Sequence, residues 1–245
     1  FWNIDDNVWG VNVQRTIDLY KEMARQVKGK YWFGAGDLVT PQGKRGDELL
    51  EAARNAGMTS IMVGFESTHM PTLEEFKATS KQGKQRLETI ARIREAGIDV
   101  MLFVMVGSRQ DHRGVFDEIL ELCDRYKVSA HPVMTTPFPG TELRKMYEPY
   151  LLPNMDWDQH DGNHALYEHP DPDMTPQDRE DALIKLRADL FTWRRILSRI
   201  TQISFKGFPR AHITSFFVQY PQGRAFKQYA REYFAQEQRK LLPPP

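Results

Sequence analysis

The chain has 245 residues, of which 40% are hydrophobic and 27% are charged, a composition typical of globular proteins. Lysine plus arginine and aspartate plus glutamate each number 33, so the formal net charge is zero and a general nucleic-acid-binding surface is not expected. No apolar run approaches the roughly 20 residues that cross a bilayer, and the single cysteine, Cys123, excludes an intramolecular disulfide and favours a reducing, cytoplasmic location.

The first part of the chain predicts strands that alternate with helices. The expected strands are 1–4, 31–35, 59–65, 98–106 and 129–136. The expected helices are 13–27, 48–56, 84–96 and 115–126, with one short helical piece in 68–83. Asn12 and Asp47 are the expected N-caps of the first two long helices. Because parallel strands need crossover connections, which are nearly always right-handed, the alternation predicts a parallel sheet.

These strands are too few for a complete eight-unit barrel, which usually needs about 250 residues. The expected fold is therefore α/β, with a partial barrel of parallel strands over 1–141 and a variable, mainly helical region over 142–245. The second region predicts helices at 143–150, 176–204 and 226–241, with an irregular connection over 151–172. Thr175, Pro176 and Asp178 mark the start of the long helix, and Gly207 and Pro209 are expected to end it.

Polar residues follow several expected strands at the point where each strand ends. Glu66 and Ser67 come directly after the apolar run 61–65, and a carboxylate in that position needs partners or water. The carboxyl ends of parallel strands share one edge of the sheet, where open α/β sheets and barrels bind ligands. The other residues expected at this edge are Asp5, Asp6, Asp37 and Gly107.

Each of these residues also has a purely structural interpretation. Asp5 and Asp6 are equally consistent with turn and capping chemistry, and Asp37 taken alone favours such a role. Gly107 either permits a tight turn or lets backbone amides approach a ligand closely. The joint occurrence of these residues at one edge is what favours a binding site.

Histidines and Cys123 give weaker signals. His160, His164 and His169 lie with aspartates in the irregular connection, but their spacing matches no compact metal motif, so exposed loop residues are favoured over a metal site. Cys123 lies on the apolar face of a helix, which favours a buried structural thiol over a nucleophile. The aromatic residues of 205–220 suit core packing, with a lid or partner surface as the alternative.

The ordered set of segments resembles the radical S-adenosylmethionine (SAM) superfamily, in particular the branch with a cobalamin-binding domain before the radical domain. The matching pieces are Asp5-Asp6-Asn7 with Asn12, Tyr31-Trp32, Gly57 with Ile61 and 64–67, 96–98 leading to 103–107, and 137–141. The resemblance implies a partial (β/α)6 barrel. In that family a Cys-x-x-x-Cys-x-x-Cys loop holds a [4Fe–4S] cluster that binds SAM. That loop is absent here, and one cysteine cannot hold such a cluster.

The resemblance also implies roles for matching positions. Glu66 and Ser67 match residues that contact SAM, Val106 and Gly107 match the stretch beside the adenine, and Asp5 and Asp6 match an acidic strand end facing SAM or substrate. The loop that contains Phe138 matches one near the adenine and the barrel mouth. The expected cofactor-binding residues are therefore Asp5, Asp6, Asp37, Glu66, Ser67, Val106, Gly107 and Phe138, with no metal ligands expected within the chain.

The expected function is that of the C-terminal part of a radical SAM enzyme, with the cysteine loop and a possible cobalamin domain upstream of Phe1. Such an enzyme carries out methyl transfer, cyclisation or rearrangement of a small or lipid-like organic substrate, with a flavodoxin or ferredoxin as reductant. If the sequence is instead the whole protein, cluster binding is lost. Two other interpretations stay open: a divalent-metal (β/α)-barrel enzyme at the acidic edge, and a non-catalytic scaffold that binds a partner through its aromatic C-terminal region.

Overall fold

A four-stranded parallel sheet forms the centre of the part of the chain that the structure describes. The computed structural model describes residues 3, 5–78, 84–153 and 155–240. The strands are β1 (Trp32–Gly36), β2 (Met58–Glu66), β3 (Asp99–Val106) and β4 (Ser129–Met134), and they lie side by side in sequence order. The predicted α/β class and parallel sheet are thus confirmed. The strand predicted at 1–4 lies outside the described residues, apart from Asn3.

Helices cover one face of the sheet. After α1 (Val13–Gln26), the helices α2 (Gly46–Asn55), α4 (Lys84–Glu95) and α5 (Val115–Tyr126) follow successive strands, and the short α3 (Met70–Glu75) follows β2. Buried and partly exposed residues alternate along β2 and β3, so one face of each strand enters the core. The core residues of this face include Ile61, Val63, Val100, Leu102 and Val104 from the strands, with Leu49, Leu50, Ile90, Ile93 and Ile119 from the helices.

The helix starts show where the sequence prediction holds and where it is wrong. Asn12 caps α1 as predicted, since its side chain accepts a hydrogen bond from the Arg15 amide at 3.1 Å. Asp47 is not the N-cap of α2, because the helix already begins at Gly46 and Asp47 lies in its first turn. Gly46 approaches the Pro41 carbonyl so closely that an added Cβ would lie 1.8 Å from it, so this first position of the helix has no room for a side chain.

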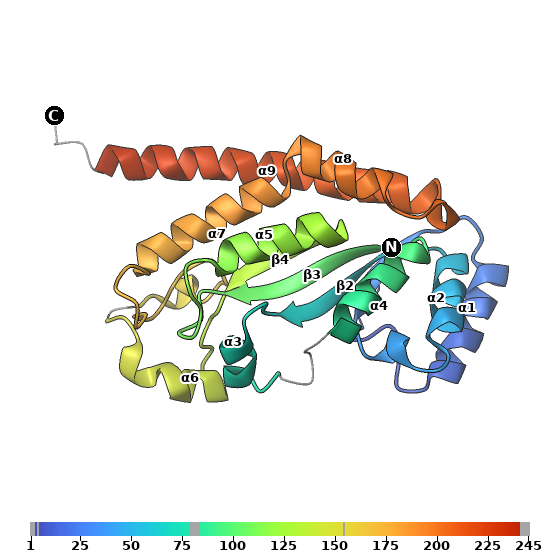
Figure 1. The fold of residues 1–245 in the computed structure, drawn as a ribbon, viewed down its shortest axis with the longest axis horizontal. Helices are drawn as coiled ribbons and strands as arrows, with labels where there is room; N and C mark the ends of the chain where they lie inside the picture. The colour runs from blue at the N-terminus through green and yellow to red at the C-terminus, as the bar shows by residue number, and fades with distance from the viewer. Residues whose placement is uncertain (1–2, 4, 79–83, 154, 241–245) are drawn as a thin grey trace.

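The C-terminal region is helical, as predicted. It contains α6 (Glu142–Tyr147), α7 (Pro176–Leu190), α8 (Trp193–Thr201) and α9 (Arg210–Lys240), and Figure 1 shows α9 as a long helix that runs past α7 and α8. The single helix predicted at 176–204 is in fact two helices that meet at Phe191. The Phe191 ring is buried against Phe226, and an added Cβ at Gly223 would lie 2.6 Å from the Phe191 carbonyl. Packing against α9 therefore breaks the helical path.

The last helix also differs from its prediction. It begins at Arg210 rather than near residue 226, and it contains Pro221 in its interior. Proline lacks an amide hydrogen and removes one helical hydrogen bond, yet the helix continues through this position. Among the described residues, no helix combines the length and apolar character needed to cross a membrane.

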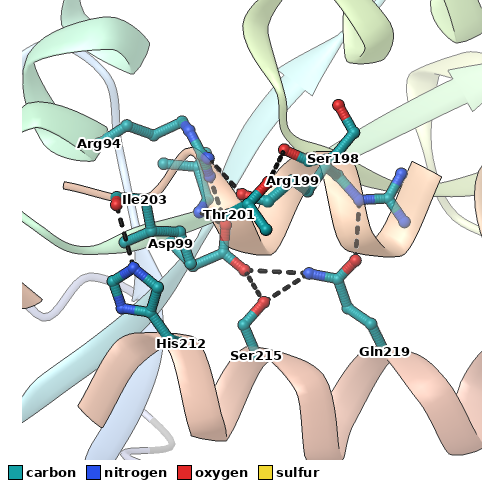
Figure 2. Close-up of polar contacts among 10 residues, drawn as sticks. Arg94, Asp99, Ser198, Arg199, Thr201, Ile203, His212, Ser215 and Gln219 are labelled. Atoms are coloured by element: carbon teal, nitrogen blue, oxygen red, sulfur yellow. Dashed lines mark hydrogen bonds and ion pairs between the residues drawn. The ribbon is translucent and has the colours of Figure 1, made fainter. Parts of the chain in front are cut away.

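A buried polar network joins α9 to the amino-terminal end of β3. The Asp99 carboxylate accepts hydrogen bonds from Arg94 at 2.7 Å, Ser215 at 2.5 Å and Gln219 at 3.1 Å, and Gln219 accepts one from Arg199 at 2.8 Å (Figure 2). Asp99 is 4% exposed, so its charge needs these partners. The network fixes α9 across the end of the sheet opposite to the one where polar residues were expected to bind a ligand.

Candidate functional site

A polar cavity lies at the carboxyl ends of β1 and β2. Its volume is about 270 Å³. The residues that line it are Asp6, Asn7, Gly36, Asp37, Leu38, Val39, Gly64 and Arg86. Parallel strands end together at this edge, so the loop after each strand contributes to the wall. The structure thus brings together two of the predicted residues, Asp6 and Asp37. We call this the strand-end cavity.

Asp37 is held by a dense set of hydrogen bonds. Its carboxylate accepts bonds from the Asn7 side chain at 2.6 Å, from the Thr40 amide at 2.5 Å and from the Thr40 hydroxyl at 2.8 Å. The Trp9 indole donates to the Asp37 carbonyl at 3.0 Å. Burial acts to raise the pKa of Asp37, but the hydrogen bonds from Thr40, Asn7 and Val39 together lower it below its ordinary value. The cavity therefore contains a fixed, ionised carboxylate.

Arg86 supplies the positive charge of this cavity, and sequence reasoning missed it. The side chain comes from α4 and is 5% exposed. Burial lowers the pKa of Arg86 to about 10, and the nearby charge of Glu66 opposes this effect. One sequence signal could have found it, because Arg86 shares a helix face with Thr89, Ile90 and Ile93, all of which are buried.

Glu66 ends β2 in an unusual backbone conformation. Its φ of 66° lies in the left-handed region, which non-glycine residues rarely adopt. The register between β2 and β3 shifts between Gly64 and Glu66, as at a β-bulge. Such strain is found at functional sites more often than elsewhere. Ser67, which follows, is buried, and its hydroxyl accepts a hydrogen bond from the His69 amide at 3.0 Å.

Val106 and Gly107 lie at the end of β3, where their groups contact the C-terminal region. Gly107 has a φ of 76°, and an added Cβ would lie 2.5 Å from the Met134 sulfur, so the position requires glycine. The Gly107 carbonyl accepts hydrogen bonds from the Tyr167 hydroxyl at 2.7 Å and from Arg179 at 3.1 Å. Val106 is fully buried. Contacts within the chain therefore already occupy the carbonyl of this turn.

The remaining predicted residues, Asp5 and Phe138, lie outside the lining of the strand-end cavity, as do Glu66, Ser67, Val106 and Gly107. Asp5 is exposed, and its charge adds to burial in raising the pKa of Tyr20. Phe138 is 49% exposed, and its carbonyl accepts a hydrogen bond from the Thr141 hydroxyl at 2.6 Å. Both residues are accessible, and neither lines the cavity.

A second polar cluster, also missed by sequence reasoning, lies beyond the ends of β2 and β3. Asp111 accepts hydrogen bonds from the Thr72 hydroxyl at 2.5 Å and the Ser108 amide at 3.1 Å. Glu75 accepts one from the Tyr147 hydroxyl at 2.8 Å. Burial raises the pKa of both carboxyl groups, and the charge of Asp111 adds to the effect on Glu75. We call these two groups the buried acid pair.

The chain's own residues do not fit an iron–sulfur cluster. Cys123 is its one cysteine; it is fully buried in α5, and burial raises the pKa of its thiol to about 12. Within the described ranges, no group of three or more histidine, cysteine, aspartate or glutamate side chains is arranged to hold a metal ion. His164 instead contacts Asp161 at 3.0 Å, and the His169 ring accepts a hydrogen bond from the Asp171 amide.

No protein-family model matches the chain, and no curated protein is significantly similar to it.

Proposed function

We propose that the strand-end cavity binds S-adenosylmethionine and that the chain is part of a radical SAM enzyme of the cobalamin-associated branch. The observation that supports this best is the combination of two carboxylates, Asp6 and Asp37, with the Arg86 guanidinium around one polar cavity. SAM carries ribose hydroxyls and an ammonium group, which pair with carboxylates, and a carboxylate, which pairs with a guanidinium. The fold class is consistent with the partial barrel that the sequence resemblance implies.

The residues of this chain would bind and orient SAM. The Asp37 carboxylate already accepts four hydrogen bonds within the chain, so it would attract the ligand ammonium group through its fixed negative charge rather than through a new hydrogen bond. Arg86 would hold the ligand carboxylate, and Glu66, at the end of β2, would add a third carboxylate to Asp6 and Asp37. Cysteines that the chain does not contain would hold the cluster that supplies the radical chemistry. Methyl transfer, cyclisation or rearrangement of a small or lipid-like organic molecule, with a flavodoxin or ferredoxin as reductant, completes the proposal.

Isothermal titration calorimetry of the chain with SAM tests the proposal. Wild-type chain should bind SAM, and Asp6→Asn should weaken binding about tenfold or more, the size expected for one charged hydrogen bond. Asp173→Asn is the matched control, since Asp173 is exposed and contacts Arg113 away from the cavity. Absence of binding, or equal affinity in the two variants, would contradict the proposal. Methionine and adenosine as competitors would show which part of SAM the cavity holds.

A second candidate function is partner binding without catalysis, and the aromatic surface of α8 and α9 favours it. Trp193, Phe216, Phe217 and Tyr220 form one contiguous ring cluster, and Phe217 is 68% exposed. Exposed aromatic clusters are common at protein interfaces. Comparison of the proteins captured by wild-type chain and by Phe217→Ser tests this candidate, and an unchanged set would count against it.

A further inference from the structure

A second, larger cavity lies between the sheet and α9. Its volume is about 340 Å³. The residues that line it are Phe33, Ser60, Ile61, Met62, Asp99, Met101, Phe103, Ser129, His131, Ser215, Val218, Gln219 and Gln222. Most of the strand residues among them belong to the partly exposed face, which α2, α4 and α5 do not cover. We call this the sheet-face cavity.

The floor of the sheet-face cavity is apolar and spans neighbouring strands. Met62 of β2 pairs with Met101 of β3, and Phe103 of β3 pairs with His131 of β4, with 5.0 Å between the ring centres. Phe33 extends this surface onto β1. Methionine adapts its shape to irregular ligands, and aromatic rings supply a large apolar area. The floor therefore favours an apolar molecule of extended or flat shape.

The walls offer no charge to a ligand. Asp99 is the only acidic residue among the lining residues, and Arg94, Ser215 and Gln219 already bond its carboxylate (Figure 2). Burial, with a smaller contribution from Arg187, lowers the pKa of His131, so its imidazole is neutral at neutral pH. A charged ligand would lose its hydration without gaining a partner of opposite charge.

One polar atom that lines the cavity lacks a hydrogen-bond partner. The Gln222 side-chain oxygen is buried and has no hydrogen-bond partner among the described residues. A buried acceptor without a donor is unfavourable, whereas a ligand N–H or O–H group in the cavity would satisfy it. The neighbouring polar residues of α9, Ser215 and Gln219, bond each other at 2.6 Å and Asp99, so among the lining residues of α9 Gln222 has the acceptor left for a ligand.

We propose that the sheet-face cavity binds a neutral, mainly apolar small molecule that donates one hydrogen bond to Gln222. Its volume falls within the usual range of small-molecule pockets, about 300–1,000 Å³. The proposal does not depend on SAM binding at the strand-end cavity, because a different set of residues lines each cavity.

Fluorescence titration with N-phenyl-1-naphthylamine tests the proposal, because this probe is neutral, apolar and carries one N–H group. Wild-type chain should bind it with saturation at one molecule per chain. Two filling variants, Met101→Trp and Ser60→Phe, should each weaken binding at least tenfold. Gln222→Leu should weaken it about threefold to tenfold, the range for one neutral hydrogen bond.

A second probe separates the hydrogen bond from general apolar binding. N-methyl-N-phenyl-1-naphthylamine lacks the donor, so Gln222→Leu should leave its affinity unchanged while both filling variants weaken it. Phe217→Ser is the control on α9, since Phe217 is exposed and does not line the cavity. Circular dichroism checks that each variant folds, and if a filling variant does not, Gln222→Leu with the two probes decides.

Several results would overturn the proposal. They are failure of wild-type chain to bind the donor probe, undiminished binding by folded filling variants, loss of binding in Phe217→Ser, or equal effects of Gln222→Leu on both probes. Sedimentation analysis tests whether a second copy of the chain binds at this surface instead. Self-association that the filling variants abolish would assign the surface to a second copy of the chain. Because SAM affinity is measured separately, failure here leaves the proposed function standing, and the reverse also holds.

Discussion

The guanidinium carbon of Arg86 lies 3.6 Å from the centre of the Phe65 ring, and the Arg86 side chain also donates a hydrogen bond to the Phe65 carbonyl at 2.9 Å. One residue of α4 thus binds both the ring and the backbone of the residue that precedes Glu66. This pair of contacts fixes the end of β2 and places a buried positive charge beside the strand-end cavity.

Replacing Arg86 tests this relationship. We expect Arg86→Met to keep an apolar chain near Phe65 but to leave the Phe65 carbonyl without its donor. The free energy of unfolding should fall by about 1.5–3 kcal/mol, the range for a hydrogen bond to a charged group. Urea denaturation measures the change. Arg113→Met is the control: Arg113 is exposed, its contacts are with Asp173, and its replacement should change stability by less than about 1 kcal/mol.

The left-handed backbone of Glu66 gives a second prediction. Glu66→Gly should be more stable than Glu66→Ala by about 1 kcal/mol, because glycine adopts this conformation without the Cβ penalty. Lys127 ends α5 at a φ of 56°, so Lys127→Gly and Lys127→Ala should differ by a similar amount. Measurement of SAM affinity distinguishes the role of Glu66 from that of Lys127. Both Glu66 variants should weaken binding by about 1–3 kcal/mol, and neither Lys127 variant should change it. Equal SAM affinity throughout would remove Glu66 from the proposed site.

The buried acid pair predicts a pH dependence of stability. Asp111 has a pKa raised above its ordinary value of 3.8, so over the interval above that value the folded protein binds more protons than the unfolded chain. The contribution of Asp111 to the free energy of unfolding is therefore present in acid and is lost as the pH rises. Asp111→Asn should reduce the loss as the pH rises above about 4, as should Glu75→Gln. Urea midpoints across this range measure the effect, and Asp173→Asn should keep the wild-type slope.

The start of α7 provides a test of the C-terminal region. Thr175 accepts a hydrogen bond from the Asp178 amide at 3.1 Å, and the Asp178 side chain accepts one from the Thr175 amide at 3.1 Å. Thr175→Ala should lower the free energy of unfolding by about 1 kcal/mol. Thr201→Ala is the matched control, because the Thr201 hydroxyl bonds only carbonyls of its own helix, Leu197 and Ser198. A cost as large for Thr201→Ala would contradict the capping role.

The sequence predicted the sheet because apolar strands and amphipathic helices alternate in it, and both patterns are local. It also predicted the capping groups of α1 and α7, since these lie within a few residues of the helix starts. Local patterns did not predict the break between α7 and α8 at Phe191, because the break depends on packing against a helix that follows later in the chain. The start of α9 at Arg210, upstream of the interior Pro221, was not predicted either.

In the candidate site too, local features were predicted from the sequence and tertiary contacts were not. Asp6 and Asp37 were predicted as site residues because they follow strands, and the end of a strand can be located in the sequence. Arg86 enters the strand-end cavity from a helix whose rotation depends on the core, and the buried acid pair joins residues of α3 and the loop after β3. Such pairings depend on tertiary contacts, which a single sequence does not display.

Both borders of the sheet are occupied by the chain itself. Beside β1, the amides of Asn3 and Val8 donate to the Phe33 and Ala35 carbonyls. Beside β4, the most important group is Arg187, which donates twice to the Pro132 carbonyl, at 3.1 and 2.9 Å. Unpaired strand edges promote aggregation by adding strands from other molecules. A buried guanidinium where another strand would bind therefore blocks pairing with a strand of another molecule at this position of the edge.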